Sequence, residues 1–550
     1  MTARPNVLWI STHDISPHLG TYAGVWPGAE QAVTPHLDAL AADGARFDNA
    51  FAAAPVCAPS RSAIMTGCYP TAIGTIHMRT KAVPPPEVTL FTEYLRAAGY
   101  YTTNNWFTDF QVDTPPTAFD DCSETGHWRN RPDPATPFFA AFHGMVTHES
   151  QIYLDDDAFA RVTSNVTDEQ RHHPDDVELP PYYPDTPVFR RSWARYLDLV
   201  TEMDAWVGGL LSELDDDRLR DDTIVVFWSD HGLGMPRAKR WAHEAGLREP
   251  LIVRWPESIA PGTVRTEIVQ LMDLAPTMLA ALDLPVPDHM HGAPLFDSHG
   301  EFRSPNTYAF GARERMDEQE DSVRTVRNGR YRYIRNLHPD RSELQHHQYA
   351  DHLDTWREFR RLAFEEAGQL ARGQHPDRLT DLQRTIVAPA KPEEELYDIA
   401  ADPHETRNLA VDPEHADALE ELRSALDTWT SRYGDLGLLP ERELLDAWRP
   451  GGRQPSTALP EVSIVDGLIH AACSTEGASI GWTRDPPRQV TDEAAEAVSP
   501  MGSVTGAPEP DGRHWHLYAE PFEATPGERI WVGAWRMGFA PSGIVEAPTA

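Results

Sequence analysis

The stretch TIVVFWSDHG, at residues 223–232, decides the fold class of this chain. It opens with an unbroken run of β-branched and aromatic residues, which predicts a strand buried on both faces of a sheet. Three more segments have the same character: PNVLWIST (5–12), TPFFAAFHG (136–144) and PLIVRWP (250–256). Strands buried on both faces need a layer of other structure on each side, so these segments predict an α/β protein.

Helices are expected between these strands. TPHLDALAADGAR (34–46) has Thr34 at the N-cap position, Pro35 at the first helical position and Gly44 near its end. The stretch 190–214 carries apolar residues at three- and four-residue spacing, as an amphipathic helix does. Alternating strands and helices predict an α/β/α sandwich.

The pattern changes beyond about residue 320. VRTVRNGRYRYIRN reads as a β-hairpin, and short strands separated by turn residues follow a stretch rich in Pro and Gly. We expect an α/β domain over 1–320, an α+β subdomain over 321–447, a linker over 448–460, and a small β-sandwich over 461–550 that contains a loop at 486–512.

Composition excludes several classes of partner. The net charge of −37, from 48 basic and 85 acidic side chains, repels phosphate backbones, so no nucleic-acid partner is expected. No run approaches the roughly 18 apolar residues of a membrane span. Four cysteines are too few for a disulfide framework in 550 residues. The first residues do not resemble a secretory leader, so the expected compartment is the cytoplasm.

Polar side chains stand at three predicted strand ends. His13 and Asp14 follow the first strand, His148 lies just past another, and Asp230 and His231 end a third. Ligands of open α/β sheets bind at the carboxyl ends of strands, so these residues are expected to converge. Carboxylate oxygens at two strand ends suit a divalent cation.

The strongest motif is CAPSRSAIMTG, at residues 57–67. It resembles the sulfatase signature, Cys-x-Pro-Ser-Arg followed by a short apolar stretch and Thr-Gly. The resemblance extends from residue 5 to about 435 and includes VLWISTHDISPHLGTYAG, IVVFWSDHGLGMPRAKRW and EELYDIAADPHETRNLA. The block MVTHES and the order of segments place the chain nearest the heparan N-sulfatase (sulfamidase) branch and its bacterial relatives.

This resemblance implies an alkaline-phosphatase-like α/β/α sandwich with a smaller α+β subdomain behind it. Residues 461–550 in turn resemble the small β-sandwich at the C-terminus of chitobiase and β-hexosaminidase-like proteins.

The family also implies a modified nucleophile. Cys57 is expected to be oxidised to formylglycine by a formylglycine-generating enzyme, and the hydrated aldehyde then supplies the oxygen that attacks sulfur. Arg61 is expected to stabilise that hydrate. Asp14, Asp230 and the modified Cys57 are expected to bind the metal ion, together with His13 and His231.

Other residues match family positions around the sulfate. Lys239, one of only three lysines, is expected to bind the sulfate and to take part in catalysis. His148 is the candidate general acid that protonates the leaving group. His77 and Trp106 are expected to contact substrate, and Arg79, in the same GTIHMRT segment as His77, is a further candidate.

Three departures from the family pattern affect these expectations. His13 stands where most sulfatases have an acidic residue, which weakens a Ca²⁺ site and favours a softer ion. Ca²⁺ remains the first expectation, with Mn²⁺ and Mg²⁺ open. His231 stands where many members have Asn. Trp106 and Phe107 occupy a place where relatives commonly carry a lysine, so a cationic contact is replaced by stacking surface.

Together these residues predict a formylglycine-dependent sulfatase that hydrolyses a sulfate ester or sulfamate on a sugar. Two alternatives stay open: a Mn²⁺-dependent phosphodiester or phosphonate monoester hydrolase of the same superfamily, and a sulfated-glycan-binding protein without turnover. The sulfated position, the choice between O- and N-sulfate and the oligomeric state are left open.

Overall fold

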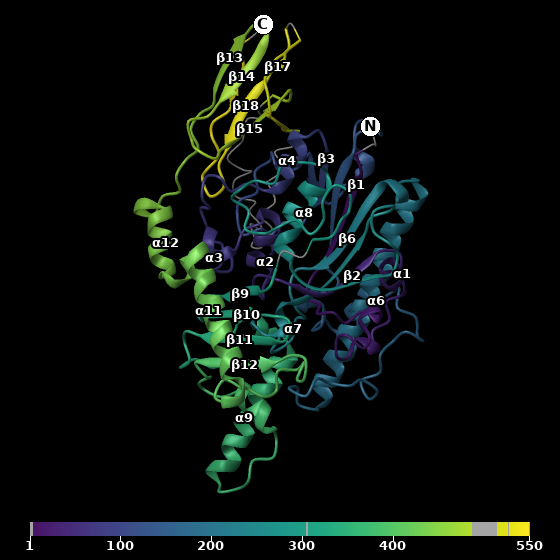
Figure 1. Ribbon diagram of the computed structural model, residues 1–550, viewed down its shortest axis with the longest axis vertical. Coiled ribbons are helices and arrows are strands. Elements are labelled where there is room, and N and C mark those ends of the chain that lie inside the picture. The colour runs from purple at the N-terminus through teal and green to yellow at the C-terminus, as the bar shows by residue number, and fades with distance from the viewer. Residues whose placement is uncertain (1–3, 304–305, 487–513, 526, 549–550) are drawn as a thin grey trace.

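An eight-stranded mixed sheet lies at the centre of the computed structural model, which describes residues 4–303, 306–486, 514–525 and 527–548 (Figure 1). The strand order is β4-β3-β5-β1-β6-β7-β2-β8. The strands are β1 Asn6–Thr12, β2 Ala45–Phe51, β3 Tyr101–Asn105, β4 Asp121–Ser123, β5 Phe138–Gly144, β6 Thr223–Ser229, β7 Arg248–Arg254 and β8 Thr263–Gln270. From residue 487 on, the loop expected over 486–512 lies outside the described residues.

The register of the central strands aligns their carboxyl ends. β1 is parallel to both β5 and β6, and Thr12 pairs with Gly144 on one side and with Ser229 on the other. The segments that leave these three strands therefore start from one edge of the sheet. β7 is antiparallel to β6 and to β2, so the sheet is mixed.

Helices cover both faces of this sheet, which confirms the α/β/α prediction (Figure 1). Side chains of β1 alternate between the faces: Leu8 and Ile10 pack on the side of α1 and α6, and Val7 and Trp9 on the side of α2, α4 and α8. These helices are α1 Pro35–Ala42, α2 Cys57–Thr66, α4 Phe91–Ala97, α6 Pro187–Asp216 and α8 Leu274–Ala281, and the shorter ones are α3 Pro70–Ile73, α5 Asp156–Val162 and α7 Glu244–Leu247.

The helix expected over 34–46 ends at Ala42 because the chain enters the sheet as β2 three residues later. Thr34 does not cap α1 through its side chain. Its hydroxyl instead accepts a hydrogen bond from the Gly20 backbone N–H and donates one to Asp38.

A second, antiparallel sheet follows, in the order β12-β11-β10-β9. The expected hairpin is confirmed, with Val323 opposite Asn336. β9 belongs to this sheet although it precedes residue 321, the predicted start of the subdomain. The strands of this sheet are β9 Ala309–Arg313, β10 Val323–Arg327, β11 Tyr331–Asn336 and β12 Glu394–Asp398. The helices of this part of the chain are α9 Asp354–Ala371, α10 Asp381–Ile386, α11 Ala416–Tyr433 and α12 Glu441–Trp448.

The C-terminal module consists of two small antiparallel sheets, β13-β14-β17 and β16-β15-β18-β19. Ile469, Ile530 and Val532 form a buried core between them. The module also contacts the α/β domain, since Arg536 donates to the Pro84 carbonyl and Ser479 to Glu93. Its strands are β13 Glu461–Val465, β14 Leu468–Ala472, β15 Ser479–Thr483, β16 His516–Leu517, β17 Phe522–Glu523, β18 Trp531–Trp535 and β19 Val545–Glu546.

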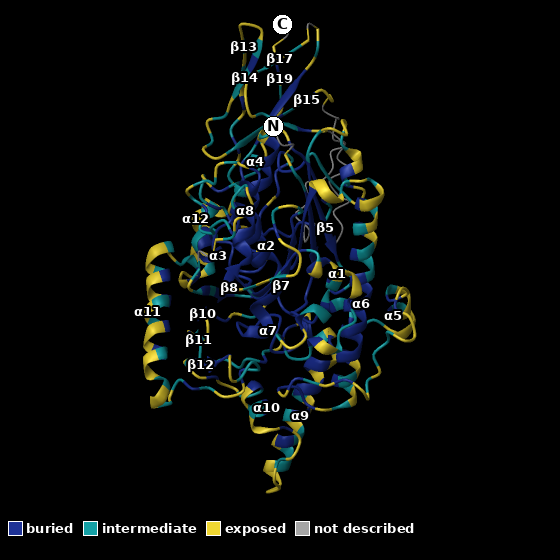
Figure 2. Ribbon diagram, turned by 45° about the vertical axis from the view of Figure 1, so that its right-hand side comes forward, coloured by how far each residue is buried: buried dark blue, intermediate teal, exposed yellow. Residues whose placement is uncertain are grey.

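Burial is concentrated in the large sheet and the helices against it, while α11 exposes one long face (Figure 2). Among the described residues, no helix combines the length and the apolar character that crossing a bilayer requires.

Candidate active site

Two carboxylates meet where β1 and β6 end side by side. Asp14 lies two residues beyond Thr12, and Asp230 directly follows Ser229, the register partner of Thr12. Both side chains are fully buried, and the Asp14 N–H lies 3.4 Å from Asp230 Oδ1. Asp14 has a φ of +53°, an uncommon conformation for a residue other than glycine, so the chain turns sharply at this point. The predicted convergence of the two strand ends is confirmed.

Cys57 is the first residue of α2, and it points at the same strand ends. Its Sγ lies 3.1 Å from Nε2 of His231, and the Ser60 hydroxyl in the same helical turn donates to the Asp230 carbonyl. Burial raises the pKa of the Cys57 thiol well above its usual range. The helix start therefore places the Cys57 side chain beside both metal-ligand candidates, with the positive end of the helix dipole behind it.

The side chains around this thiol present acceptors toward one another. Nδ1 of His231 lies 3.0 Å from the Gly232 carbonyl, which fixes its proton there and leaves Nε2 as a lone pair. That Nε2 lies 3.2 Å from Asp14 Oδ1 and 3.6 Å from Asp230 Oδ1. Asp14 Oδ1 receives no hydrogen bond from the described residues. A converging set of acceptors without donors is stabilised by a cation.

The donor set fits a divalent metal ion. His13, Cys57 and Asp230 have potential ligand atoms within 4.8 Å of one another, and so do Asp14, Cys57 and His231. Nδ1 of His13 also lies 2.9 Å from Asp230 Oδ2. Oxygen donors suit Ca²⁺ and Mg²⁺, and two imidazoles shift the preference toward Mn²⁺. All five residues predicted as metal ligands are therefore gathered at one place.

Lys239 connects this cluster to a carboxylate that the sequence did not single out. Its Nζ lies 2.8 Å from Asp14 Oδ2 and 3.0 Å from Glu149 Oε1. The Glu149 backbone N–H donates to Asp14 Oδ2 at 2.7 Å. Burial alone would raise the pKa of Asp14, but nearby positive charge, above all that of Lys239, outweighs it and lowers that pKa. The site therefore holds Asp14 as a carboxylate.

Arg61 lies one helical turn after Cys57 and is fully buried. Its Nε donates to the Thr108 carbonyl at 2.8 Å, and its guanidinium stacks on the Phe107 ring at 5.0 Å. Its Nη1 has no hydrogen-bond partner among the described residues. Arg61 therefore keeps one donor without a partner among these residues, one helical turn after Cys57.

His148 lies at the partly exposed side of the cluster, just beyond β5. Its ring is 6.2 Å from that of His13, and its Nδ1 is 2.9 Å from the Ser150 hydroxyl. Burial and then Lys239 lower the pKa of His148 to about 4. A bound anionic group would oppose this shift, because negative charge favours the imidazolium.

His77 and Trp106, two residues predicted to contact substrate, make their contacts with residues outside the predicted metal-ligand set. Nδ1 of His77 lies 3.9 Å from Oε2 of Glu441, a residue of α12. Trp106 is half-buried, 6.0 Å from Phe107, and it is Phe107 that packs edge-on against His13 at 4.8 Å. Contacts of His77 and Trp106 with substrate stay predictions.

Three further residues of the site were not predicted. Glu149 forms a two-point ion pair with Arg240. His143 of β5 bridges Ser11 and Asn104, with Nδ1 2.5 Å from the Ser11 hydroxyl and Nε2 2.7 Å from Asn104 Oδ1. A polar side chain inside an apolar strand sequence was the available signal for His143.

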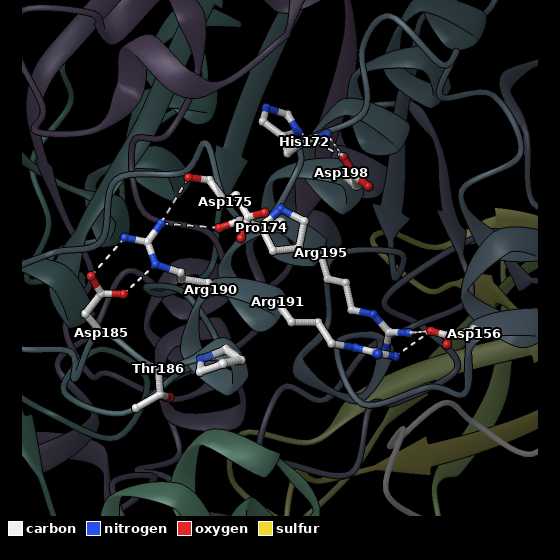
Figure 3. A pocket seen from close by; sticks show the side chains of 12 residues that line it. Asp156, His172, Pro174, Asp175, Asp185, Thr186, Arg190, Arg191, Arg195 and Asp198 are labelled. Atoms are coloured by element: carbon white, nitrogen blue, oxygen red, sulfur yellow. Dashed lines mark hydrogen bonds and ion pairs between the residues drawn. The ribbon is translucent and has the colours of Figure 1, made fainter.

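A separate cavity of about 600 Å³ lies at the start of α6 (Figure 3). Its arginines already have carboxylate partners: Arg190 pairs with Asp185, and Arg191 and Arg195 with Asp156. The chemistry-bearing residues named above do not line it, so it is not the candidate active site.

Two family models match the chain. The Sulfatase model matches residues 5–133 and 127–284, and the model of the C-terminal part of N-sulphoglucosamine sulphohydrolase matches residues 232–360.

Curated proteins of similar sequence are also sulfatases or sulphohydrolases. An ulvan-active sulfatase of Formosa agariphila is 34% identical over all of this chain and 92% of its own length. Human N-sulphoglucosamine sulphohydrolase is 27% identical over 72% of this chain and 85% of its own length.

Solved structures show a shared fold. One, in complex with its substrate D-glucosamine-2-N,6-O-disulfate, has a TM-score of 0.54 and 18% identity over 78% of this chain and 98% of that chain. A phosphonate monoester hydrolase from Silicibacter pomeroyi has a TM-score of 0.53 and 20% identity over 79% of this chain and 97% of that chain. The fold is therefore shared by a protein whose substrate is a sulfated sugar and by a phosphonate monoester hydrolase.

Proposed function

The chain belongs to the sulfatase family, and we propose that it hydrolyses a sulfate ester or sulfamate on a sugar, using a formylglycine made from Cys57. The observation that carries this proposal is the position of Cys57 Sγ, 3.1 Å from His231 Nε2 and beside the buried Asp14 and Asp230. A sugar is the substrate class because similar proteins include an ulvan-active sulfatase and N-sulphoglucosamine sulphohydrolase.

Two groups complete the site in this proposal. Formylglycine, made by a formylglycine-generating enzyme, supplies a geminal diol as the nucleophile. A divalent ion, with Ca²⁺ as the first expectation, supplies positive charge that neutralises the sulfate oxygens. Asp14, Asp230, His231 and His13 would hold the ion together with the modified Cys57.

The remaining side chains divide the other tasks. Lys239 donates to a sulfate oxygen, and its present partners Asp14 and Glu149 keep it charged and fixed. Arg61, whose Nη1 has no partner among the described residues, stabilises developing negative charge. His148, at the partly exposed side, delivers a proton to the departing oxygen or nitrogen.

The decisive experiment measures modification and turnover on the same protein. Mass spectrometry of the Cys57 peptide from the native host should show an aldehyde in place of the thiol. That protein should hydrolyse aryl and sugar sulfates faster than an aryl phosphonate. The C57A variant should lose turnover, and the matched C473A variant, altered in the C-terminal module, should retain it.

Each alternative function predicts a different result in this experiment. Faster turnover of the phosphonate, stimulated by Mn²⁺, would identify a phosphonate hydrolase. Tight binding of a sulfated glycan, with no turnover despite full aldehyde content, would identify a binding protein. An unmodified thiol in active protein would exclude the formylglycine route.

A further inference from the structure

We propose that Arg79 binds a second anionic group, a carboxylate or another sulfate, on the sugar from which sulfate is removed. This inference rests on the proposed function and makes Arg79 a determinant of substrate specificity. Three observations carry it: the place of Arg79 near the candidate active site, its free guanidinium, and the rigid segment that holds it.

Two contacts place Arg79 near the candidate active site. Met78 forms a small buried cluster with Val56, which precedes Cys57, and with Met316. The guanidinium of Arg79 lies 3.6 Å from Asp109, whose charge raises the pKa of Arg79 against the effect of burial. The residue before Asp109, Thr108, accepts a hydrogen bond from Arg61 through its carbonyl, so Arg79 pairs with the same segment that holds Arg61.

The guanidinium of Arg79 is available for binding. Its side chain is 39% exposed, and its only carboxylate partner among the described residues is Asp109, at 3.6 Å. In contrast, Arg240 is 2% exposed and held by Glu149 at two points, and Arg61 is fully buried. Of these three arginines around the site, Arg79 is the one open to solvent. A guanidinium with free donors suits two-point binding of a carboxylate or sulfate.

The backbone that carries Arg79 is fixed on both sides. Its φ is +54°, its N–H donates to Gln111 Oε1 at 2.7 Å, and Met78 exchanges hydrogen bonds with Arg315. Further along, the Lys81 carbonyl accepts from Arg449. A residue held in this left-handed conformation needs such support, and a fixed position reduces the entropy lost on binding.

The C-terminal module takes part in this support. Arg536 donates to the Pro84 carbonyl, and the backbone of Gly538 packs against Ala82 so closely that a Cβ there would lie 2.6 Å from the Ala82 carbonyl oxygen. The module therefore packs against the segment that follows Arg79 and helps to hold it in place.

Tyr349 offers a surface for the sugar ring beside His148. It is 38% exposed, and its ring lies 6.4 Å from that of His148. An exposed aromatic ring can stack on a sugar, and a cation beside it can bind an acidic substituent. A local cation matters here because the protein as a whole carries a net charge of −37.

The test compares three sulfated sugars that share the scissile sulfate: one otherwise neutral, one with an added carboxylate and one with a second sulfate. For the variant R79Q, the ratio of kcat/KM on a doubly anionic sugar to kcat/KM on the neutral one should fall by about 10- to 100-fold, mainly through KM, as expected for a lost charged hydrogen bond. R79K should recover part of that ratio. R442Q, which alters a 91% exposed arginine on α12, should leave the ratio unchanged.

The experiment distinguishes a carboxylate ligand from a sulfate ligand, and it tests the Arg79 proposal separately from the proposed function. The sugar whose ratio falls more in R79Q identifies the carboxylate or the sulfate as the ligand. An unchanged ratio in R79Q, with normal wild-type turnover, overturns the role of Arg79 alone. If wild-type protein with full aldehyde content turns over none of the sugars, the proposed function fails. Equal binding of the doubly anionic sugars by C57A and by C57A/R79Q in calorimetry then overturns the Arg79 proposal as well.

Discussion

Arg240 donates to both carboxylate oxygens of Glu149, at 2.9 and 2.8 Å, and neither side chain is more than 2% exposed. The same carboxylate pairs with Lys239, and its backbone N–H donates to Asp14. This buried ion pair is thus connected to both Lys239, the proposed sulfate ligand, and Asp14, a metal-ligand candidate.

Removing Glu149 should damage both stability and activity. The E149A variant leaves Arg240 and Lys239 without their shared partner, and breaking a buried pair costs about 3–5 kcal/mol. The urea midpoint should fall accordingly, and kcat should fall because Lys239 loses a contact that positions it. D446N, which removes a 73% exposed carboxylate at 3.9 Å from Arg442, should cost less than about 1 kcal/mol. Similar losses in both variants would contradict a special role for the buried pair.

Removal of the metal ion should abolish turnover. We expect a chelator to inactivate the protein and one added divalent ion to restore it, with Ca²⁺ and Mn²⁺ compared directly. D14N and D230N should each reduce ion affinity by more than about 100-fold, beyond the effect of losing an outer-shell partner. Elemental analysis and thermal shift with added ion measure this without relying on activity. Full ion content in both variants would show that these carboxylates are not ligands.

Loss of His148 should matter most for poor leaving groups. In H148Q, kcat for a sugar sulfate should fall by about 10²–10⁴-fold, the usual contribution of a general acid. An aryl sulfate with an acidic phenol needs little protonation and should lose much less. The measurement is the dependence of kcat on leaving-group pKa, which should become steeper. S150A, which removes only the hydroxyl beside Nδ1, is the matched control and should change this slope little. Equal losses on both substrates in H148Q would exclude the acid role.

His18 should make the fold sensitive to acid. Burial lowers the pKa of His18 to about 3, and Trp26 donates to its Nε2 at 3.0 Å, so the folded protein holds it neutral. In the unfolded chain it binds a proton near pH 6.5. Its contribution to stability is therefore complete above pH 6.5 and is lost as the pH falls toward 3, by about 1.4 kcal/mol per pH unit.

Urea unfolding at several pH values measures this contribution. The difference in stability between wild type and H18Q should shrink as the pH drops from 6.5 to 4. H173Q, at a 67% exposed histidine, should follow the wild type throughout. A difference that stays constant with pH would contradict the prediction.

Much of the site could be predicted because its parts lie at strand ends. Asp14 and Asp230 each follow a buried apolar strand. Because β1 and β6 are parallel neighbours in the sheet, the residues that follow them lie close together. Cys57 was recognised from a local string of residues that also starts a helix. Glu149 escaped notice because nothing local marks its partner, Arg240, which lies 91 residues away.

The sequence by itself determined the layered α/β architecture and the β-hairpin of the second sheet, and it predicted Cys57 as the nucleophile. These depend on periodicity and on short motifs, which are properties of neighbouring residues. Only the tertiary structure decided that β7 runs antiparallel to β6, that His77 faces Glu441, and that Arg79 stays open beside the site. Such features depend on contacts between segments far apart in the chain, and those contacts are selected by the packing of the whole fold.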